Sequence, residues 1–122
     1  MNNNKSNSLT RDLIFKKYNG HCAYCGIKIE RISFHIDHIQ ALRRGDRIHS
    51  KKGKDSIENY NPSCPSCNSS KNVLSIEDWR REIQLKINRI NRDSAQYRIL
   101  KRFGLIKETN NAVVFYFETL ES

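Results

Sequence analysis

The spacing of apolar side chains predicts short helices on either side of a strand-forming region. Residues 10–20 suit a helix, because Thr10 can cap free backbone N–H groups at its start and Gly20 can adopt the left-handed conformation that ends it. Residues 27–37 have apolar side chains at mostly alternate positions, with one break in register that fits a turn. Since alternation is typical of a half-buried strand, we expect a strand in this region.

The second half of the chain predicts a loop, two helices and a further strand. Residues 43–58 are polar and have no apolar period, which is typical of a loop. A long helix opens at residues 75–78 with an approximate capping box, and a second helix starts near Asp93 and ends before Gly104. The apolar run over residues 112–117 is rich in β-branched and aromatic side chains and indicates a buried strand.

The long helix is expected to be amphipathic. Its apolar residues recur at intervals of three and four, and three arginines fall on the opposite side. It therefore has a predicted core face, formed by Ile76, Trp79, Ile83, Ile87 and Ile90, and a predicted basic face, formed by Arg81, Arg89 and Arg92.

Together these elements predict an α+β fold in a single domain. The chain has 122 residues, a length that fits one compact domain. We expect residues 1–8 to be a disordered N-terminus and residues 9–122 to form the domain, with a core over 20–74 and an extension of helix and strand over 75–122.

Composition argues against a membrane-spanning role and against secretion. The longest apolar run, residues 112–117, falls far short of the roughly 18 to 20 residues that a spanning helix needs. The Asn- and Ser-rich start of the chain has no apolar run of the kind that a secretory signal contains. We therefore expect a cytoplasmic protein with no membrane partner.

Charge and apolar content change this picture in two ways. The 22 lysines and arginines outnumber the 13 aspartates and glutamates, and the net charge of +9 suggests a polyanionic partner: DNA, RNA or an anionic lipid surface. Only 37% of the residues are apolar, a small supply for burying enough surface to offset conformational entropy. A crosslink is therefore expected to help stabilise the fold.

Four cysteines are candidates for this crosslink. Cys22 and Cys25 form one Cys-x2-Cys pair and Cys64 and Cys67 form another, with 38 residues between the pairs. In a reducing compartment such pairs more often bind a metal than form disulfides. Four thiolates suit a Zn²⁺ ion at about 2.3 Å, and a closed shell of four leaves no position for substrate, so this zinc would be structural. Two disulfides and an iron–sulfur cluster are the less favoured alternatives.

A second candidate site lies between the cysteine pairs. Asp37 and His38 stand side by side at the end of the expected strand, where a carboxylate can bind a hard cation while an imidazole takes a proton. The simpler interpretation of a histidine in a basic protein is a solvated surface group, which we apply to His21 and His49. His35 is expected on the same face of the strand as Asp37, so a role as a metal ligand, or as a partner of one, is the alternative to the packed side chain that we expect.

The cysteine pairs, the Asp37-His38 pair, Asn59 and Asn68 together resemble the HNH endonuclease family, whose core is a ββα-metal (His-Me) finger. The match covers residues 22–71. The resemblance implies that Asp37 and Asn68 bind a catalytic divalent ion. It also implies that His38 is the general base and that Asn59 orients this base.

The activity implied by the resemblance is metal-dependent hydrolysis of DNA. A Mg²⁺, Mn²⁺ or other divalent ion would act as a Lewis acid on the phosphate. An imidazole, which ordinarily titrates near pH 6.5, would take the proton of the attacking water. The family further implies products with 5′-phosphate and 3′-hydroxyl ends, and residues 75–118 resemble the tail of some bacterial and phage members.

The sequence departs from the family pattern at two places. Asn68 stands where many members have histidine, and its neutral oxygen should bind the ion less tightly than an imidazole would. The usual proline and Gly-Gly after Asp-His-Ile are replaced by residues 40–46, so the path of this loop is expected to differ.

Basic residues are candidates for phosphate contacts. They lie in the polar loop, after the second cysteine pair and on the basic face of the long helix: Arg43, Arg44, Arg47, Lys51, Lys52, Lys54, Lys71, Arg81 and Arg89. A solvated loop and an ordinary polar helix face are the alternative interpretation. Since no base-reading motif is present, the enzyme would cut with weak sequence preference or take its specificity from a protein partner.

The main rival hypothesis is a zinc-ribbon DNA-binding or adaptor module without catalysis. It explains the cysteines and the charge but leaves Asp37-His38, Asn59 and Asn68 as coincidence. A degenerate HNH domain that binds DNA without cutting it is a second rival.

Overall fold

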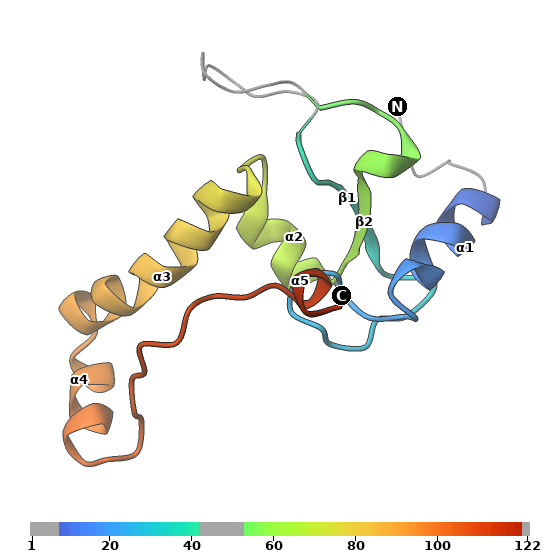
Figure 1. Ribbon diagram of the computed structural model, residues 1–122. Coiled ribbons are helices and arrows are strands. Elements are labelled where there is room, and N and C mark those ends of the chain that lie inside the picture. Colours follow the sequence, from blue (N-terminus) through green and yellow to red (C-terminus); the bar gives the residue numbers. More distant parts are fainter. Residues whose placement is uncertain (1–7, 42–52, 121–122) are drawn as a thin grey trace. The chain divides into compact units, whose positions relative to one another are not determined.

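The computed structural model describes residues 8–41 and 53–120, and the chain falls into two compact units (Figure 1). The first unit consists of Met1–Ile76 and Val114–Ser122, and the second of Glu77–Val113. No helix among the described residues is both long enough and apolar enough to pass through a lipid bilayer.

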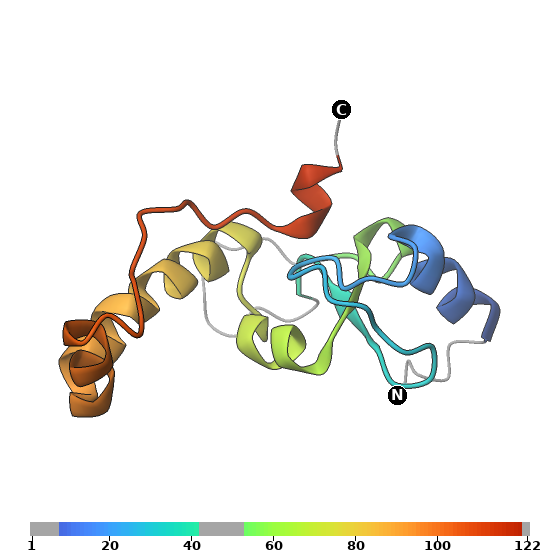
Figure 2. The same cartoon turned by 90° about the horizontal axis from the view of Figure 1, so that it is seen from below.

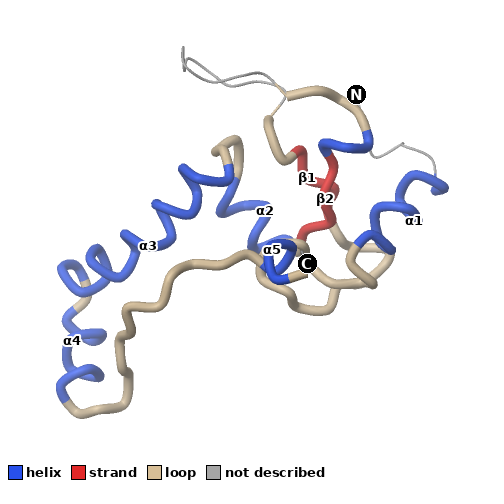
Figure 3. The backbone as a smooth tube through the Cα atoms, viewed as in Figure 1, coloured by secondary structure: helices blue, strands red, loops and turns tan. Residues whose placement is uncertain are grey.

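The first unit is built around a two-stranded antiparallel sheet (Figures 1 and 2). β1 (His35–His38) pairs with β2 (Tyr60–Ser63), and α2 (Pro65–Lys71) follows β2 directly. Both strands are short, and loops make up much of this unit (Figure 3). The mixture of helices and an antiparallel sheet confirms the predicted α+β class. The other elements of the unit are α1 (Ser8–Lys17), the 3-10 helix η2 (Ile57–Asn59) and α5 (Tyr116–Thr119).

α1 begins earlier than the sequence predicts. It starts at Ser8, so Thr10 lies inside the helix and not at its cap. The C-terminal end of α1 agrees better with the prediction, because Gly20 follows the helix with a φ of +78°. Lys17, the last residue of α1, donates a hydrogen bond to the carbonyl of Tyr60 at 2.7 Å and so ties the helix to β2.

The strand expected over residues 27–37 is wrong for most of its length. Lys28 forms only an isolated bridge, residues 31–33 form a turn, and pairing with β2 starts at His35. Ile32, one of the alternating apolar residues, is 91% exposed. Alternation alone indicated the strand, but a strand also needs a neighbour that shares its backbone hydrogen bonds. Among the described residues, β2 provides that neighbour for only the last three residues of the expected strand, and for His38 after it.

The register of the sheet decides which side chains face the interior. Asp37 lies opposite Asn61, and both are buried, whereas His38 lies opposite Tyr60, and both are partly exposed. Neighbouring residues of a strand project to opposite faces of the sheet. Asp37 and His38 therefore leave β1 on different sides.

The C-terminal segment packs on the first cysteine pair. The backbone N–H groups of Tyr116 and Phe117 donate to the carbonyls of Tyr24 and Ala23, at 2.9 and 2.8 Å. The ring of Phe115 is buried and lies edge-on to that of Tyr24, with 5.8 Å between ring centroids. Residues 114–120 thus belong to the first unit, with Phe115 in its core, although they follow the second unit in the sequence.

The strand predicted over residues 112–117 is wrong. Residues 112–115 have no regular structure, and α5 begins at Tyr116. The carboxylate of Glu118 accepts the N–H of Phe115 at 2.8 Å, which favours the start of a helical turn. The aromatic content that suggested a strand serves instead to pack this segment on the rings of the first unit.

The second unit contains the two predicted helices. Almost all of α3 (Ile76–Asp93) and the whole of α4 (Ala95–Arg102) belong to it. Ser94 caps α4 by accepting the N–H of Tyr97 at 3.1 Å, and Gly104 follows with a φ of +76°. The predicted core face of α3 is buried only near its start, because Trp79 is buried whereas Ile87 and Ile90 are exposed.

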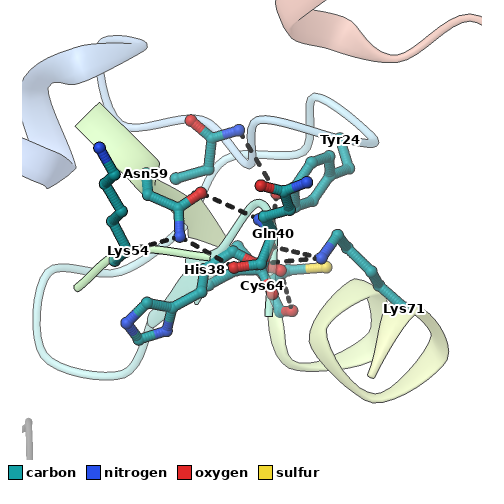
Figure 4. A network of polar contacts seen from close by, with 10 residues as sticks. Tyr24, His38, Gln40, Lys54, Asn59, Cys64 and Lys71 are labelled. Carbon is teal, nitrogen blue, oxygen red and sulfur yellow. Dashed lines mark hydrogen bonds and ion pairs between the residues drawn. The ribbon is translucent and has the colours of Figure 1, made fainter. Parts of the chain in front are cut away.

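A buried lysine holds α2 against β1. The side chain of Lys71, the last residue of α2, is 0% exposed. Its Nζ lies 3.2 Å from Oδ2 of Asp37 and donates a hydrogen bond to the carbonyl of His38 at 3.1 Å (Figure 4). When one member of a buried ion pair is removed, the remaining charge is left without compensation, which is far more costly than loss of an exposed pair. The contact therefore fixes the helix to the end of the strand.

Lys71→Met should destabilise the protein strongly. Methionine keeps an unbranched side chain of similar reach but leaves Asp37 buried without its cation, and such a loss costs about 3–5 kcal/mol. The measurement is the free energy of unfolding in urea, with Lys16→Met, which replaces an exposed lysine of α1, as the matched control. Equal unfolding midpoints for the two variants would contradict this role of the ion pair.

Candidate functional site

The four cysteines meet at one point of the first unit. The Sγ atoms of Cys22, Cys25, Cys64 and Cys67 all lie within 4.8 Å of one another. The first two flank a tight turn closed by a hydrogen bond from the N–H of Gly26 to the carbonyl of Cys22, at 3.0 Å. The other two lie at the start of α2, where Sγ of Cys64 accepts the N–H of Cys67 at 3.4 Å.

The spacing of the sulfurs fits a tetrahedral metal site. Four ligands at about 2.3 Å from a central zinc ion would lie about 3.8 Å from one another. The Sγ atoms of Cys25 and Cys64 are 3.8 Å apart, and all four cysteines are free thiols. The two disulfides, which were the less favoured alternative, are therefore not formed, and the arrangement supports the predicted metal site.

The thiols interact strongly with one another. A hydrogen bond from the thiol of Cys67 lowers the pKa of Cys22 to about 4. The same hydrogen bond is the largest cause of a raised pKa at Cys67, and burial is the second cause. Burial also raises the pKa of Cys25. The cluster thus accepts a first negative charge easily and resists further ones, and a divalent cation is the kind of group that compensates for them.

The carboxylate of Asp37 is held through one of its oxygens. Oδ2 accepts a hydrogen bond from the hydroxyl of Tyr24 at 2.5 Å and lies 3.2 Å from Nζ of Lys71. Burial raises the pKa of Asp37, while the charge of Lys71 and the Tyr24 hydrogen bond oppose that rise. Burial and the nearby carboxylate also raise the pKa of Tyr24, so its hydroxyl stays protonated and remains a donor. Both of these contacts are made by Oδ2, and together they fix the orientation of the carboxylate.

His38 lies on the other face of β1, in contact with residues that the sequence analysis did not identify. Its Nε2 is 3.1 Å from Oδ1 of Asp55, and its ring stands edge-on to that of Tyr60, at 5.1 Å between centroids. The side chain is 20% exposed, so solvent reaches it. The cross-strand position of Tyr60 could have been found by pairing the strands, but nothing in the sequence distinguishes Asp55 within its polar loop.

The side chain of Asn59 links the backbone at Gln40, before the polar loop, to the backbone at Lys54, within that loop. Its Oδ1 accepts the N–H of Gln40 at 2.9 Å, and its Nδ2 donates to the carbonyls of Gln40 and Lys54, at 2.9 and 2.8 Å (Figure 4). These contacts lie just after His38 in the chain and do not include its imidazole. A side chain at Gly53 would collide with the carbonyl of Gln40, which explains the glycine there.

Asn68 lies in the middle of α2 and is half-buried. Its backbone N–H donates to the carbonyl of Cys64 at 3.0 Å, as the helix requires. Residues three apart on a helix share a face, so Asn68 lies on the same side of α2 as Lys71, whose side chain contacts Asp37. The structure thus brings the helix that carries Asn68 next to the strand that carries Asp37.

Of the residues expected to contact phosphate, five lie outside the described residues, one is buried and three are exposed. Arg43, Arg44, Arg47, Lys51 and Lys52 lie outside the described residues. Lys54 is exposed, whereas Lys71 is fully buried on Asp37 and is not at the surface. Arg81 and Arg89 are exposed, but each is paired with a carboxylate, at 3.0 Å from Asp78 and 2.8 Å from Glu82 respectively.

Two of the remaining histidines lie among the described residues, and both differ from expectation. His35 is exposed at the start of β1, although a packed side chain was expected. His21 is half-buried, with its ring 5.5 Å from that of Tyr116, so the expected solvated position does not describe it. His49 lies outside the described residues.

Comparisons with known proteins point to one family. The family model described as HNH endonuclease matches residues 22–73. Over 86 residues, or 69% of this chain, the sequence is 36% identical to YoqL of Bacillus subtilis strain 168, a protein named as an SPbeta prophage-derived, inferred HNH endonuclease. The chain spans 34% of that relative's length.

A solved structure has a similar fold. The crystal structure of the Type II-C Cas9 enzyme from Actinomyces naeslundii matches 64% of this chain, and 8% of the Cas9 chain, with a TM-score of 0.52. The sequences are 22% identical over the match, so the likeness concerns the fold alone. Through the segment from Cys22 to Val73, which carries the four cysteines and the Asp37-His38 pair, the chain therefore belongs to the HNH endonuclease family.

Proposed function

We propose that the protein is a metal-dependent DNA endonuclease that hydrolyses phosphodiester bonds. The observation that supports this most directly is the pairing of a fixed carboxylate with a solvent-accessible imidazole at the end of one strand, within a segment that matches the HNH family. In this proposal Asp37 and Asn68 hold a catalytic divalent ion, and His38 activates the attacking water.

The protein groups supply two parts of the reaction. When bound, Mg²⁺ or Mn²⁺ would neutralise negative charge on the phosphate oxygens. His38 in its neutral form takes a proton from water, and general-base assistance of this kind is typically worth about 10² to 10⁴ in rate. Lys71 and Tyr24 hold the carboxylate of Asp37 in a fixed orientation, which favours one geometry for the ion.

The cysteine cluster is proposed to hold a structural zinc ion. Zinc would link the turn at Cys22 and Cys25 to the start of α2, two parts of the chain far apart in sequence. Structural zinc sites of small modules contribute roughly 10 to 16 kcal/mol of binding free energy, which is comparable to the stability of a whole domain. Such a link would fix the helix that carries Asn68.

DNA is the proposed substrate, mainly through its phosphates. The net charge of +9 favours a polyanion, and Lys54 is an exposed basic residue next in the chain to Asp55, which contacts His38. A protein partner that supplies sequence specificity remains part of the proposal, because the chain contains no base-reading motif.

One observation favours a second function. Nζ of Lys71 lies 3.2 Å from Asp37 and compensates its charge, so the buried carboxylate does not require a metal ion. The alternative is therefore a non-catalytic DNA-binding or adaptor module, and a cleavage assay separates the two.

The protein should cut supercoiled plasmid DNA in the presence of Mg²⁺ or Mn²⁺, and His38→Ala should lower the rate at least 100-fold. The measurement is conversion to nicked and linear forms on agarose gels. His35→Ala, a change at an exposed histidine of the same strand, is the matched control and should cut normally. A wild-type protein that stays inert with several divalent metals would support the binding module.

Cutting should become slower as the pH falls. His38 must be neutral to accept a proton, and Asp37, whose pKa is raised by burial, must be ionised to bind a cation, so protonation of either group lowers the rate. The test is the single-turnover rate between pH 5 and 9 at saturating metal. A rate that does not change down to pH 5 would require another base.

Removal of zinc should unfold the first unit. Metal analysis is expected to find one zinc per chain, and Cys67→Ser or a strong chelator should lower the thermal midpoint measured by circular dichroism. Added Mg²⁺ should not restore it, because magnesium prefers oxygen ligands. A metal-free protein with an unchanged midpoint would show that the cysteines do not hold a structural ion.

A further inference from the structure

The imidazole of His38 contacts a carboxylate that the family resemblance does not assign. Asp55 lies in the described part of the polar loop, just before η2, and its Oδ1 is 3.1 Å from Nε2 of His38. The same oxygen accepts a hydrogen bond from the hydroxyl of Tyr60 at 2.6 Å. Three side chains from three places in the chain therefore converge on one face of the sheet.

This contact determines which nitrogen of His38 carries the proton. An ionised carboxylate can only accept hydrogen bonds, so the nitrogen that faces it must donate. The hydrogen bonds from Tyr60 and His38 lower the pKa of Asp55, which keeps it ionised, and the bond to Asp55 raises the pKa of Tyr60 to about 12, which keeps its hydroxyl a donor. Nε2 is therefore the protonated nitrogen, and Nδ1 carries the free electron pair.

Two contacts limit rotation of the imidazole. Asp55 holds Nε2, and the ring of Tyr60 stands at 85° to the imidazole plane with 5.1 Å between centroids. A base whose ring is fixed needs less rearrangement before it meets the proton that it abstracts. A carboxylate that is hydrogen-bonded to a histidine in this way sets both the orientation and the tautomer of the imidazole.

We propose that Asp55 is a positioning residue for His38, fixing the imidazole with its proton on Nε2 so that Nδ1 accepts the proton of the attacking water. This inference rests on the proposed nuclease function. As the water oxygen bonds to phosphorus, its proton passes to Nδ1. The P–O3′ bond breaks, and its electron pair leaves on the 3′ oxygen, which takes a proton from solvent. The positive charge that forms on the imidazole then lies against the carboxylate of Asp55, which stabilises it.

The position of Asp55 allows this role to be separated from a structural one. Its side chain is 57% exposed, and an exposed ion pair contributes little to folding. Asp55→Ala is therefore expected to leave the thermal midpoint nearly unchanged. A lower cleavage rate in this variant would therefore result from a change at the imidazole of His38 and not from unfolding.

The test compares Asp55→Ala with Glu58→Ala, which removes an exposed carboxylate of η2 that does not contact His38. Asp55→Ala should lower the single-turnover cleavage rate about 10- to 100-fold, the range typical of partners that orient a functional histidine. DNA affinity should stay the same or rise, since a negative charge is lost. Asp55→Glu should recover part of the rate, and Glu58→Ala should cut normally. An unchanged rate in Asp55→Ala, or an equal loss in Glu58→Ala, would overturn the proposal.

A second measurement does not depend on activity. Long-range proton–nitrogen correlation spectra of the ¹⁵N-labelled zinc-bound protein without DNA distinguish the two neutral tautomers of His38. The wild type should show the proton on Nε2, and Asp55→Ala should show a mixture. A mixture in the wild type overturns the proposal. If the wild type has the fixed tautomer but never cuts DNA, the nuclease function fails while the orienting contact stands.

Discussion

The architecture of the site depends on the buried contact between Asp37 and Lys71. A carboxylate and an ammonium group both lose their hydration when they are buried, and each is tolerated there only because the other is present. Nζ of Lys71 also donates to the carbonyl of His38, so a single side chain from α2 fixes both residues of the Asp37-His38 pair. The relative position of α2 and the end of β1 follows from these two contacts.

The same contact closes a ring of interactions with the cysteine cluster. Tyr24 lies between the two cysteines of the first pair, and its hydroxyl donates to Asp37. Asp37 contacts Lys71 at the end of α2, and the second cysteine pair stands at the start of that helix. A metal bound by the cysteines and the ion pair would therefore brace the same helix at opposite ends. This arrangement explains how a chain with few apolar residues can hold polar groups in fixed positions.

The sequence predicts the parts of this arrangement whose chemistry is local. The cysteine spacing predicted the cluster, the period of three and four predicted α3, and the residues that cap and end a helix predicted α4. The roles of His38, Asn59 and Asn68 stay predictions. The strand expected over 27–37 forms only at its end, as β1, and the strand expected over 112–117 does not form, because alternation and β-propensity do not reveal whether a partner strand exists.

Other features depend on tertiary contacts that no local pattern encodes. A lysine after a cysteine pair is ordinarily a surface residue, and Lys71 is buried only because Asp37 faces α2. Asp55 looks like any other charged residue of a polar loop until the fold brings it to His38. The positions of the two side chains follow from strand geometry, because Asp37 turns toward α2 and His38 toward Asp55. In the proposed reaction, a phosphodiester would therefore lie across the end of β1 to meet both. The residues that fix this end are thus the ones that decide whether ion and base can act on one phosphate.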